Sequence, residues 1–252
     1  MNKILITRCF AKAADSYEEE ATVQRRIALK MTSLLETYIR PGCCRKILEI
    51  GCGTGLFSRM LADSLKPERM LLNDICPEMH ERLKGLLSDY VHFESGDAET
   101  YPFSGKYDLA ASCSVVQWLK DIDAFFSRIY PLLTADGIFA FSTFGCDNIK
   151  EVTSLTGKGL SYFSREELCD KLSGRYDVLY ASEEKVFKRF KSPIEVLYHL
   201  KRTGVTGIDQ QKWTKTNLIR FCDDYKTLYG NGKEVTLTYH PIYVIAKKKD
   251  HK

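Results

Sequence analysis

Glycines and acidic residues in the first hundred positions have the types and spacing to bind a nucleoside. Gly51, Gly53 and Gly55 occupy every second position after a short apolar run, and Glu49 precedes them. A glycine turn lets backbone N–H groups approach a ligand closely, because no Cβ stands in the way. An acidic residue about 20 positions beyond such a turn, where Asp74 stands, can accept hydrogen bonds from both ribose hydroxyls. This segment therefore predicts nucleoside recognition.

A second acidic residue, Asp97, extends this pattern. It follows another apolar run, and there it could accept a hydrogen bond from the amino group of an adenine, with the backbone of Ala98 nearby. Two simpler interpretations remain open, in which Asp74 caps a following helix and Asp97 only forms a turn. Leu56 stands where the dinucleotide fingerprint G-x-G-x-x-G has its third glycine, so the motif is not that of hydride-transfer enzymes.

The elements that must position these residues alternate between strand and helix. Apolar patterns predict strands at 46–50, 70–73, 91–95, 107–112 and 138–143, with helices at 56–65 and 121–133. Right-handed crossovers force the helices onto both faces of a mostly parallel sheet. Ligands of such sheets lie at the carboxyl ends of the strands. Ser112, Gln117 and Trp118 should therefore border the site, although Gln117 and Trp118 could equally be packing residues.

Both ends of the chain add further predicted elements. The apolar pattern predicts a helix at 18–39, and Tyr17 near its start could be a lid or could pack a helix end. In the second half we expect long strands at 176–190 and 234–246, with helices near 192–204 and 216–229 inserted between them. The prediction is a single domain over 1–252. Its parts are a cap region at 1–40, a ligand-binding core at 41–145, and a C-terminal half at 146–252 with a helical lid at about 191–232.

Composition excludes several other classes of protein. A chain of 252 residues can bury one sizeable core, and a net charge of +4 does not by itself indicate a nucleic-acid partner. The nine cysteines form no Cys-x-x-Cys motif, which argues against a zinc site and a disulfide framework. No run approaches the roughly 20 apolar residues of a membrane span. We therefore expect a cytoplasmic protein with no metal, no membrane partner and no nucleic acid, and we expect a monomer.

The glycine motif with its acidic partners resembles that of the Rossmann-like S-adenosylmethionine (SAM) methyltransferases. Segments outside this core are similar to a narrower family, the malonyl-[acyl-carrier protein] O-methyltransferases of biotin synthesis. The similar segments are Phe10-x-x-Ala13-Ala14-x-x-Tyr17-x-x-x-Ala21-x-x-Gln24, Ser114-x-x-Gln117-Trp118, Leu160-Ser161-Tyr162-Phe163-Ser164, and Ser192-Pro193 through Leu200-Lys201-Arg202-Thr203-Gly204-Val205-Thr206. The resemblance implies an α/β fold of the class I methyltransferase type, with a seven-stranded, mostly parallel sheet, helices on both faces and a helical lid insertion.

The same resemblance implies a reaction and a cofactor. A methyl group would move from SAM, leaving S-adenosylhomocysteine, to the free carboxylate of a malonyl thioester, so that the ester can be elongated into a pimeloyl chain. The partner would be acyl carrier protein carrying malonyl, or malonyl-coenzyme A. The expected cofactor-binding residues are Glu49, Gly51, Cys52, Gly53, Gly55, Asp74, Ile75, Asp97, Ala98 and Ser112.

Methylation of a carboxylate needs little acid–base help. The acceptor is ionised near neutral pH because an unperturbed carboxyl has a pKa of about 4. We therefore expect no catalytic base, only groups that position the reactants, and we expect His199 and His240 to be structural or surface residues. Tyr17, Gln117 and Trp118 are candidates for substrate contact. An Arg fork matches a carboxylate best, and the basic candidates in or beside the lid are Arg165, Lys191, Lys201 and Arg202.

Three alternatives stay open at this point. The acceptor could be another small carboxylate or metabolite, because exchanging the lid changes the acceptor without changing the cofactor site. The chain could also bind SAM without turnover. Nucleic-acid methylation ranks lowest, because the fourth strand lacks the Asn/Asp-Pro-Pro-aromatic motif used on flipped bases.

Overall fold

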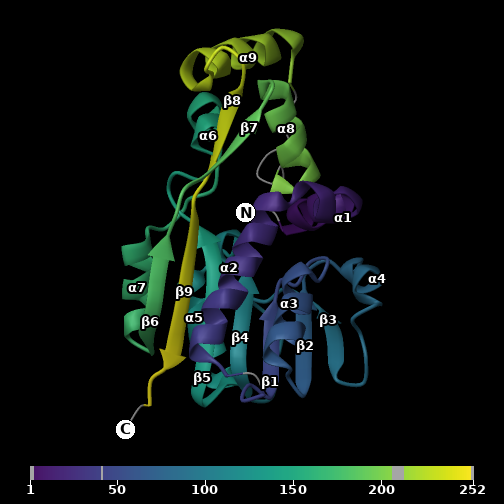
Figure 1. The fold of residues 1–252 in the computed structure, drawn as a ribbon, viewed down its shortest axis with the longest axis vertical. Helices are drawn as coiled ribbons and strands as arrows, with labels where there is room; N and C mark the ends of the chain where they lie inside the picture. The colour runs from purple at the N-terminus through teal and green to yellow at the C-terminus, as the bar shows by residue number, and fades with distance from the viewer. Residues whose placement is uncertain (1–2, 41, 206–212, 251–252) are drawn as a thin grey trace.

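A central sheet of seven strands organises the molecule (Figure 1). The computed structural model describes residues 3–40, 42–205 and 213–250. The strand order is β3-β2-β1-β4-β5-β9-β6; β9 is antiparallel to both neighbours and the other pairs are parallel. The strands are β1 (Lys46–Ile50), β2 (Arg69–Asp74), β3 (Val91–Ser95), β4 (Tyr107–Cys113), β5 (Leu133–Phe144), β6 (Tyr176–Glu183) and β9 (Pro241–Lys248). The predicted class I methyltransferase fold, with its mostly parallel sheet of seven strands, is confirmed.

Helices cover both faces of this sheet, as the crossovers require. Alternate residues of β1 divide between two cores: Ile47 joins one and Leu48 joins the other. The first core contains Ile27 of α2 (Thr22–Tyr38) and residues of α3 (Leu56–Leu65) and α4 (Met79–Leu83). The second contains Phe125 of α5 (Ile122–Ile129) and Leu172 of α7 (Arg165–Ser173). A short 3₁₀ turn, Val116–Trp118, follows β4, and another, Tyr130–Leu132, precedes β5.

The N-terminal region contains two helices where one was predicted. Helix α1 runs from Lys3 to Glu20, and the chain breaks at Ala21, where φ is −77° and ψ is 42°, before α2 begins. Tyr17 therefore lies near the end of a first helix and not near the start of a second. Apolar residues at positions 6, 10, 13 and 17 have helical spacing. This spacing indicates the first helix, α1, and the sequence prediction did not use it.

The lid region is built around a small antiparallel ribbon. Strands β7 (Val186–Phe190) and β8 (Val235–Tyr239) pair with each other, and neither belongs to the main sheet. The continuous strands predicted at 176–190 and 234–246 are therefore wrong, because each is divided between two sheets. Helices α6 (Lys150–Thr156), α8 (Pro193–Arg202) and α9 (Lys215–Tyr229) accompany the ribbon above the sheet (Figure 1). Residues 206–212 of the expected lid lie outside the described residues.

Local signals set the starts of two C-terminal helices. The side chains of Ser164 and Ser192 accept hydrogen bonds from backbone N–H groups in the first turns of α7 and α8. Pro193 occupies the first turn of α8, where its missing N–H is harmless.

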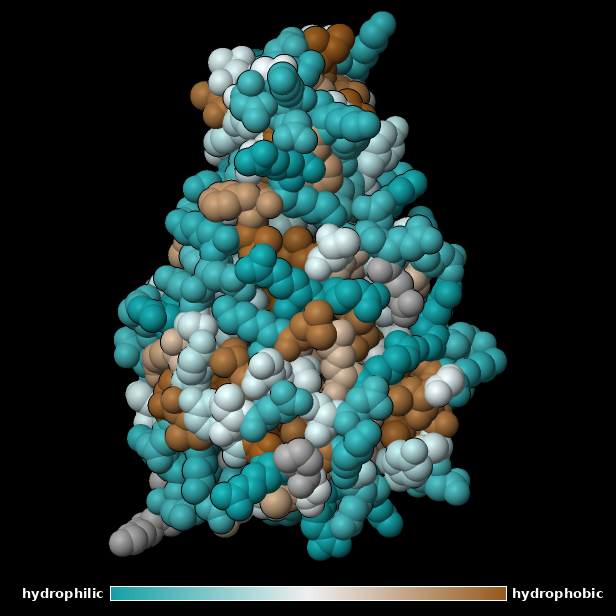
Figure 2. Space-filling view, viewed as in Figure 1, coloured by the Kyte–Doolittle hydropathy of each residue, from teal (hydrophilic) through white to brown (hydrophobic). Residues whose placement is uncertain are grey.

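The face shown in Figure 2 is mostly hydrophilic, with apolar residues in separate patches. Among the described residues, no helix has the length and apolar content needed to cross a bilayer.

Candidate active site

Three cavities lie where α1, the carboxyl ends of the strands and the lid meet. The cap cavity lies between α1 and the ends of β1 to β4, and has a volume of about 900 Å³ including its open mouth. The turn cavity lies between α2 and the glycine turn. The lid cavity lies under the lid, against α1 and the segment after β4. Tyr17 and Ser114 line all three, so the cavities adjoin one another.

The glycine turn leaves room for a ligand because its backbone adopts conformations that other residues avoid. Gly51 has a φ of +70°, and a Cβ there would lie 2.2 Å from a methyl carbon of Val115. Gly53 has a φ of +52°, and a Cβ there would meet open space next to the cap cavity. A side chain is therefore excluded by strain and by a clash at the first position, and by strain alone at the second.

The carboxylate of Asp74 is held by two backbone N–H groups. Gly53 N donates to Oδ2 at 2.9 Å and Cys76 N donates to Oδ1 at 2.8 Å. Burial raises the pKa of Asp74, and these two hydrogen bonds oppose that rise. Because Cys76 precedes α4, which begins at Met79, Asp74 does not cap the first turn of that helix. The carboxylate lines the cap cavity in a fixed orientation.

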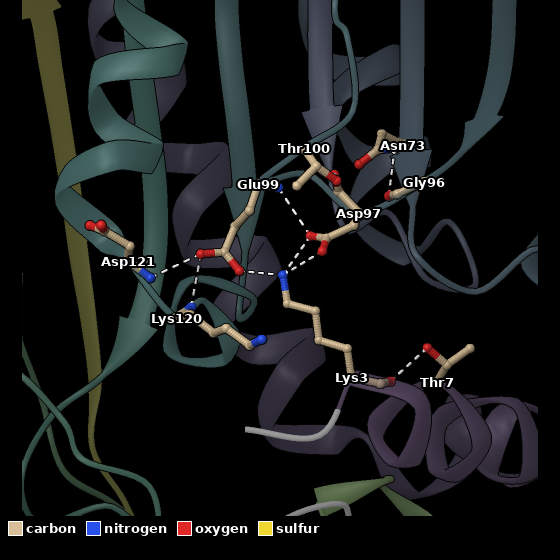
Figure 3. A network of polar contacts seen from close by, with 9 residues as sticks. All are labelled: Lys3, Thr7, Asn73, Gly96, Asp97, Glu99, Thr100, Lys120 and Asp121. Carbon is tan, nitrogen blue, oxygen red and sulfur yellow. Dashed lines mark hydrogen bonds and ion pairs between the residues drawn. The ribbon is translucent and has the colours of Figure 1, made fainter.

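Asp97, at the other end of the cap cavity, is bound to the cap helix (Figure 3). Lys3 of α1 donates to both carboxylate oxygens of Asp97 at 2.6 Å and also to Glu99. Burial alone lowers the pKa of Lys3, but the two carboxylates outweigh it and the net shift is upward. Glu99 in turn accepts the backbone N–H groups of Lys120 and Asp121 at the start of α5. This network fastens α1 over the cavity.

The turn cavity contains polar atoms that have no hydrogen-bond partner among the described residues. They are Glu49 Oε2, Gln24 Oε1, Thr54 Oγ1 and Ser114 Oγ. Glu49 is only 1% exposed. Burial raises its pKa to about 8, and nearby Asp74 adds to the rise. A buried acid and a buried amide oxygen without partners suit a cationic ligand group that carries N–H donors.

The lid cavity has a different chemical character. It is lined by aromatic and aliphatic side chains, Phe144 and Ile149 among them, and by neutral polar groups, including Gln117, Asn148 and Tyr162. The described part of its lining contains no Asp, Glu, His, Lys or Arg.

A polar network joins α1, α8 and β8 beside the lid cavity. His199 of α8 is 2% exposed; its Nδ1 lies 3.2 Å from Glu20 Oε2, and its Nε2 lies 2.8 Å from the hydroxyl of Tyr239. Burial, with Lys188 nearby, lowers the pKa of His199, although Glu20 opposes the shift. Arg202 donates to the other oxygen of Glu20 at 2.8 Å. The lid is thus tied to the same helix that covers the cap cavity.

Sequence comparison places this site in a family. Residues 48–141 match the model of the methyltransferase domain family Methyltransf_11. The malonyl-[acyl-carrier protein] O-methyltransferase of Bacteroides thetaiotaomicron is 50% identical over 260 residues, covering 99% of both chains. The protein of that name from Haemophilus influenzae is 36% identical over 98% of this chain and 95% of its own. The chain belongs to the malonyl-[acyl-carrier protein] O-methyltransferase family.

Other comparisons concern the length of one relative and the fold of two solved structures. The protein of the same name from Bacteroides fragilis is 49% identical over 98% of this chain, which spans 51% of that longer protein. The YcgJ protein of Bacillus subtilis has a TM-score of 0.64 at 14% identity, covering 88% of this chain and 99% of its own. The N-methyltransferase NodS of Bradyrhizobium japonicum, in complex with S-adenosylhomocysteine, has a TM-score of 0.54 at 13% identity, covering 93% and 99%. At such identities the likeness shows the fold alone.

The cofactor of this methyltransferase family is SAM, and the site has the groups that SAM requires. Asp74 and Asp97 bring carboxylate groups, which are hydrogen-bond acceptors, to the lining of the cap cavity. Glu49 and the unpartnered oxygen of Gln24 are acceptors for a cationic amine in the turn cavity. SAM joins an adenosine to an amino acid that carries an ammonium group, so its two ends match the two cavities.

Most of the predicted cofactor residues line these cavities, and two do not. Gly51, Gly53, Asp74, Ile75, Asp97 and Ala98 line the cap cavity, and Glu49 and Cys52 line the turn cavity. Gly55 begins α3 and lines none of the three cavities. Ser112 lies within the sheet, where its hydroxyl donates to the Ile50 carbonyl at 3.0 Å. A side-chain contact from Ser112 to the cofactor is therefore not supported.

The substrate candidates divide in the same way. Tyr17, Gln117 and Trp118 line the lid cavity. Trp118 also packs edge-on against Phe10 with ring centroids 5.6 Å apart. The basic candidates Arg165, Lys191, Lys201 and Arg202 line none of the three cavities.

Two of these basic side chains, and the two histidines, have partners inside the protein. Arg165 pairs with Glu166 on its own helix, and Arg202 pairs with Glu20, as α8 packs against α1. His199 and His240 are both buried and paired inside the protein.

Sequence reasoning missed several residues that line the site. Lys3 and Phe10 come from the helix that was not predicted, and Gln24 was part of the N-terminal motif without a role. Asn148, Tyr162 and Tyr239 are brought to the lid cavity from three distant segments. Only the three-dimensional fold could bring these together.

Proposed function

We propose that this protein transfers the methyl group of SAM to the free carboxylate of a malonyl thioester carried on acyl carrier protein. In the resembling family this ester is the primer for the pimeloyl chain of biotin. The proposal is supported by the near-complete match to the Bacteroides thetaiotaomicron relative. It is also supported by the lid cavity, which shares the lining residues Tyr17, Gln24 and Ser114 with the turn cavity.

The chemistry of the lid cavity carries the proposal. SAM, when bound, supplies a methyl group on a positively charged sulfur. A carboxylate acceptor is already ionised, so the protein has no proton to remove. The described lining has no Asp, Glu, His, Lys or Arg that could serve as a base, and this lack suits an acceptor that needs none.

The side chains of the site then act by position. When SAM is bound, Glu49 and Gln24 would hold its amino-acid end and Asp74 would hold its ribose. Tyr17 lines all three cavities and covers their junction. Burial raises the pKa of Tyr17 well above its usual value, with Cys113 and Asp74 nearby adding to it, so its hydroxyl stays protonated. Phe144 and Ile149 exclude water beside the acceptor, which strengthens the remaining polar contacts.

The test is methyl transfer from labelled SAM to malonyl-acyl carrier protein, with malonyl-coenzyme A and acetyl-acyl carrier protein as comparisons. We expect label on the malonyl thioesters and none on the acetyl one, because only malonyl has a free carboxylate. Label on none of them, with calorimetry still showing SAM binding, would contradict the proposal and favour another small carboxylate as acceptor.

A further inference from the structure

A malonyl carboxylate in the lid cavity needs a hydrogen-bond donor, and the predicted Arg and Lys side chains do not line that cavity. The polar side chains that do line it are hydroxyls and amides. A donor must have an N–H or O–H that the protein does not already use. Only a group that still has a hydrogen to donate can hold the carboxylate.

Several of these groups already form bonds within the protein, whereas Ser114 Oγ has no hydrogen-bond partner among the described residues. Gln117 donates through Nε2 to the Ser114 carbonyl at 2.6 Å and accepts from Thr143 at 3.1 Å. Thr203 donates to the His199 carbonyl at 2.9 Å. Tyr239 shares its hydroxyl with His199.

The hydroxyl of Tyr162 differs, because its role is set by Asn148. The backbone N–H of His240 can only donate, and it donates to Asn148 Oδ1 at 3.3 Å. The amide of Asn148 is therefore oriented with Nδ2 toward Tyr162, at 2.9 Å from the hydroxyl oxygen. An amide NH₂ is also only a donor, so the Tyr162 oxygen accepts this bond. Its own hydrogen has no acceptor among the described residues.

The surroundings keep that hydrogen in place and accessible. Burial raises the pKa of Tyr162 to about 12, although the bond from Asn148 opposes the rise, so the hydroxyl is protonated at neutral pH. Tyr162 lines the lid cavity and also a neighbouring cavity that includes Lys120 and Phe163. Gln117 and Phe144 are common to both. Tyr162 is therefore one of the residues shared by the lid cavity and this neighbour.

We propose that the hydroxyl of Tyr162, oriented by Asn148, donates the hydrogen bond that positions the acceptor carboxylate and distinguishes malonyl from acetyl thioesters. The inference rests on the proposed function and adds a neutral specificity-determining residue in place of an Arg fork. A neutral donor suits this reaction, because a cation bound to the carboxylate would withdraw electron density from the oxygen that must attack the methyl group. Tyr162 orients the carboxylate without placing a positive charge beside it.

The experiment compares wild type with Tyr162→Phe and with Tyr198→Phe. Tyr198 is 60% exposed on α8 and lines none of the cavities, so it is a matched control. Loss of a hydrogen bond to a charged group corresponds to about 10-fold or more in binding. We expect Tyr162→Phe to raise KM for malonyl-acyl carrier protein by about that factor. We also expect its calorimetric preference for malonyl- over acetyl-acyl carrier protein to fall similarly, with the Kd for S-adenosylhomocysteine unchanged.

A second variant separates positioning from packing. Asn148→Asp keeps the shape and still accepts from His240, but it offers Tyr162 an acceptor in place of a donor. The hydroxyl would then turn its hydrogen toward residue 148, and malonyl preference should fall as in Tyr162→Phe. Wild-type turnover with unchanged KM and preference in both variants would overturn the role of Tyr162 alone. Absence of methyl transfer by the wild type, with cofactor binding intact, would overturn the proposed function and this inference together.

Discussion

Buried acids decide much of the chemistry at the scale of single residues. Glu49 and Asp74 lie in the same site, both have raised pKa values, and burial is the main cause for each. Two backbone N–H groups offset the cost of burying the Asp74 carboxylate, whereas Glu49 has an oxygen without a partner among the described residues. The free protein therefore retains a cost at Glu49 that a cationic ligand group would remove.

Replacing Glu49 tests this at two pH values. The folded pKa of about 8 lies above the usual 4.5. The unfolded chain therefore releases a proton that the folded chain retains, and the free energy of unfolding falls as pH rises from 4.5 to 8. We expect Glu49→Gln to stabilise the cofactor-free protein more at pH 8 than at pH 5, by about 1–3 kcal/mol. Thermal melts at both pH values measure this, and equal shifts would contradict it.

The same variant should bind the cofactor less well. Glu49→Gln removes the charge that faces the cationic amine, so we expect about 10-fold weaker SAM binding by calorimetry. A variant that is more stable and yet binds more weakly would separate loss of function from loss of fold. Unchanged affinity would remove Glu49 from the cofactor site.

Asp74 should contribute through hydrogen bonds to the ribose. We expect Asp74→Ala to weaken SAM binding by about 1.5–3 kcal/mol, because charged hydrogen bonds are lost. Asp74→Asn should show how much of the loss in SAM binding comes from removing the charge. Asp63→Ala, on the exposed face of α3, is the control. Full affinity in a folded Asp74→Ala protein would refute the assignment.

At the scale of elements, α1 is the component that joins the others. It lines the cap and lid cavities, its Lys3 binds Asp97 and Glu99, and its Glu20 binds His199 and Arg202 of α8. Figure 1 shows it between the sheet and the lid helices. A helix in this place must hold its position for the cavities to keep their shape.

Removing the Lys3 charge should loosen this helix. In Lys3→Met the apolar stem is kept and the ion pairs with Asp97 and Glu99 are lost. We expect faster hydrogen exchange over α1 and several-fold faster dissociation of S-adenosylhomocysteine, because the roof of the cap cavity opens more readily. Lys12→Met on the exposed face of the same helix is a control. Exchange equal to wild type would mean that apolar packing alone holds α1.

The sheet could be predicted from sequence because its signals are local. The apolar run before Gly51 and the acids after each strand place the nucleoside end of the site without any tertiary information. The lid could not be predicted in the same way. The division of each long strand at the lid, and the meeting of Asn148, Tyr162 and Tyr239, depend on contacts between distant segments. The position of Arg202 could not be predicted for the same reason, since the choice of Glu20 as its partner is a tertiary contact.

At the scale of the whole molecule, α1 should couple cofactor binding to the lid. Helix α8 lines none of the cavities between Pro193 and Arg202, so the ligand does not touch it. We expect S-adenosylhomocysteine nevertheless to slow hydrogen exchange in α8, because binding orders α1 and α1 holds α8 through Glu20. Glu20→Gln should reduce this remote protection. Protection confined to the sheet and α1 would show that the lid behaves independently.

The ribbon under the lid has a consequence for how such enzymes change. The chain enters the lid after Phe190 and returns at Val235, and these two residues are paired neighbours on adjacent antiparallel strands. The segment between them therefore begins and ends at two residues that the ribbon holds together. Lengthening this segment raises the entropic cost of closing the loop only slightly, by about 0.6 kcal/mol for each doubling of its length. The segment between these residues, which contributes Thr203 and Val205 to the lid cavity, can thus be exchanged while Tyr162 and Asn148 stay in place. Transplanting this segment from a relative is therefore a practical way to vary that part of the lid cavity alone.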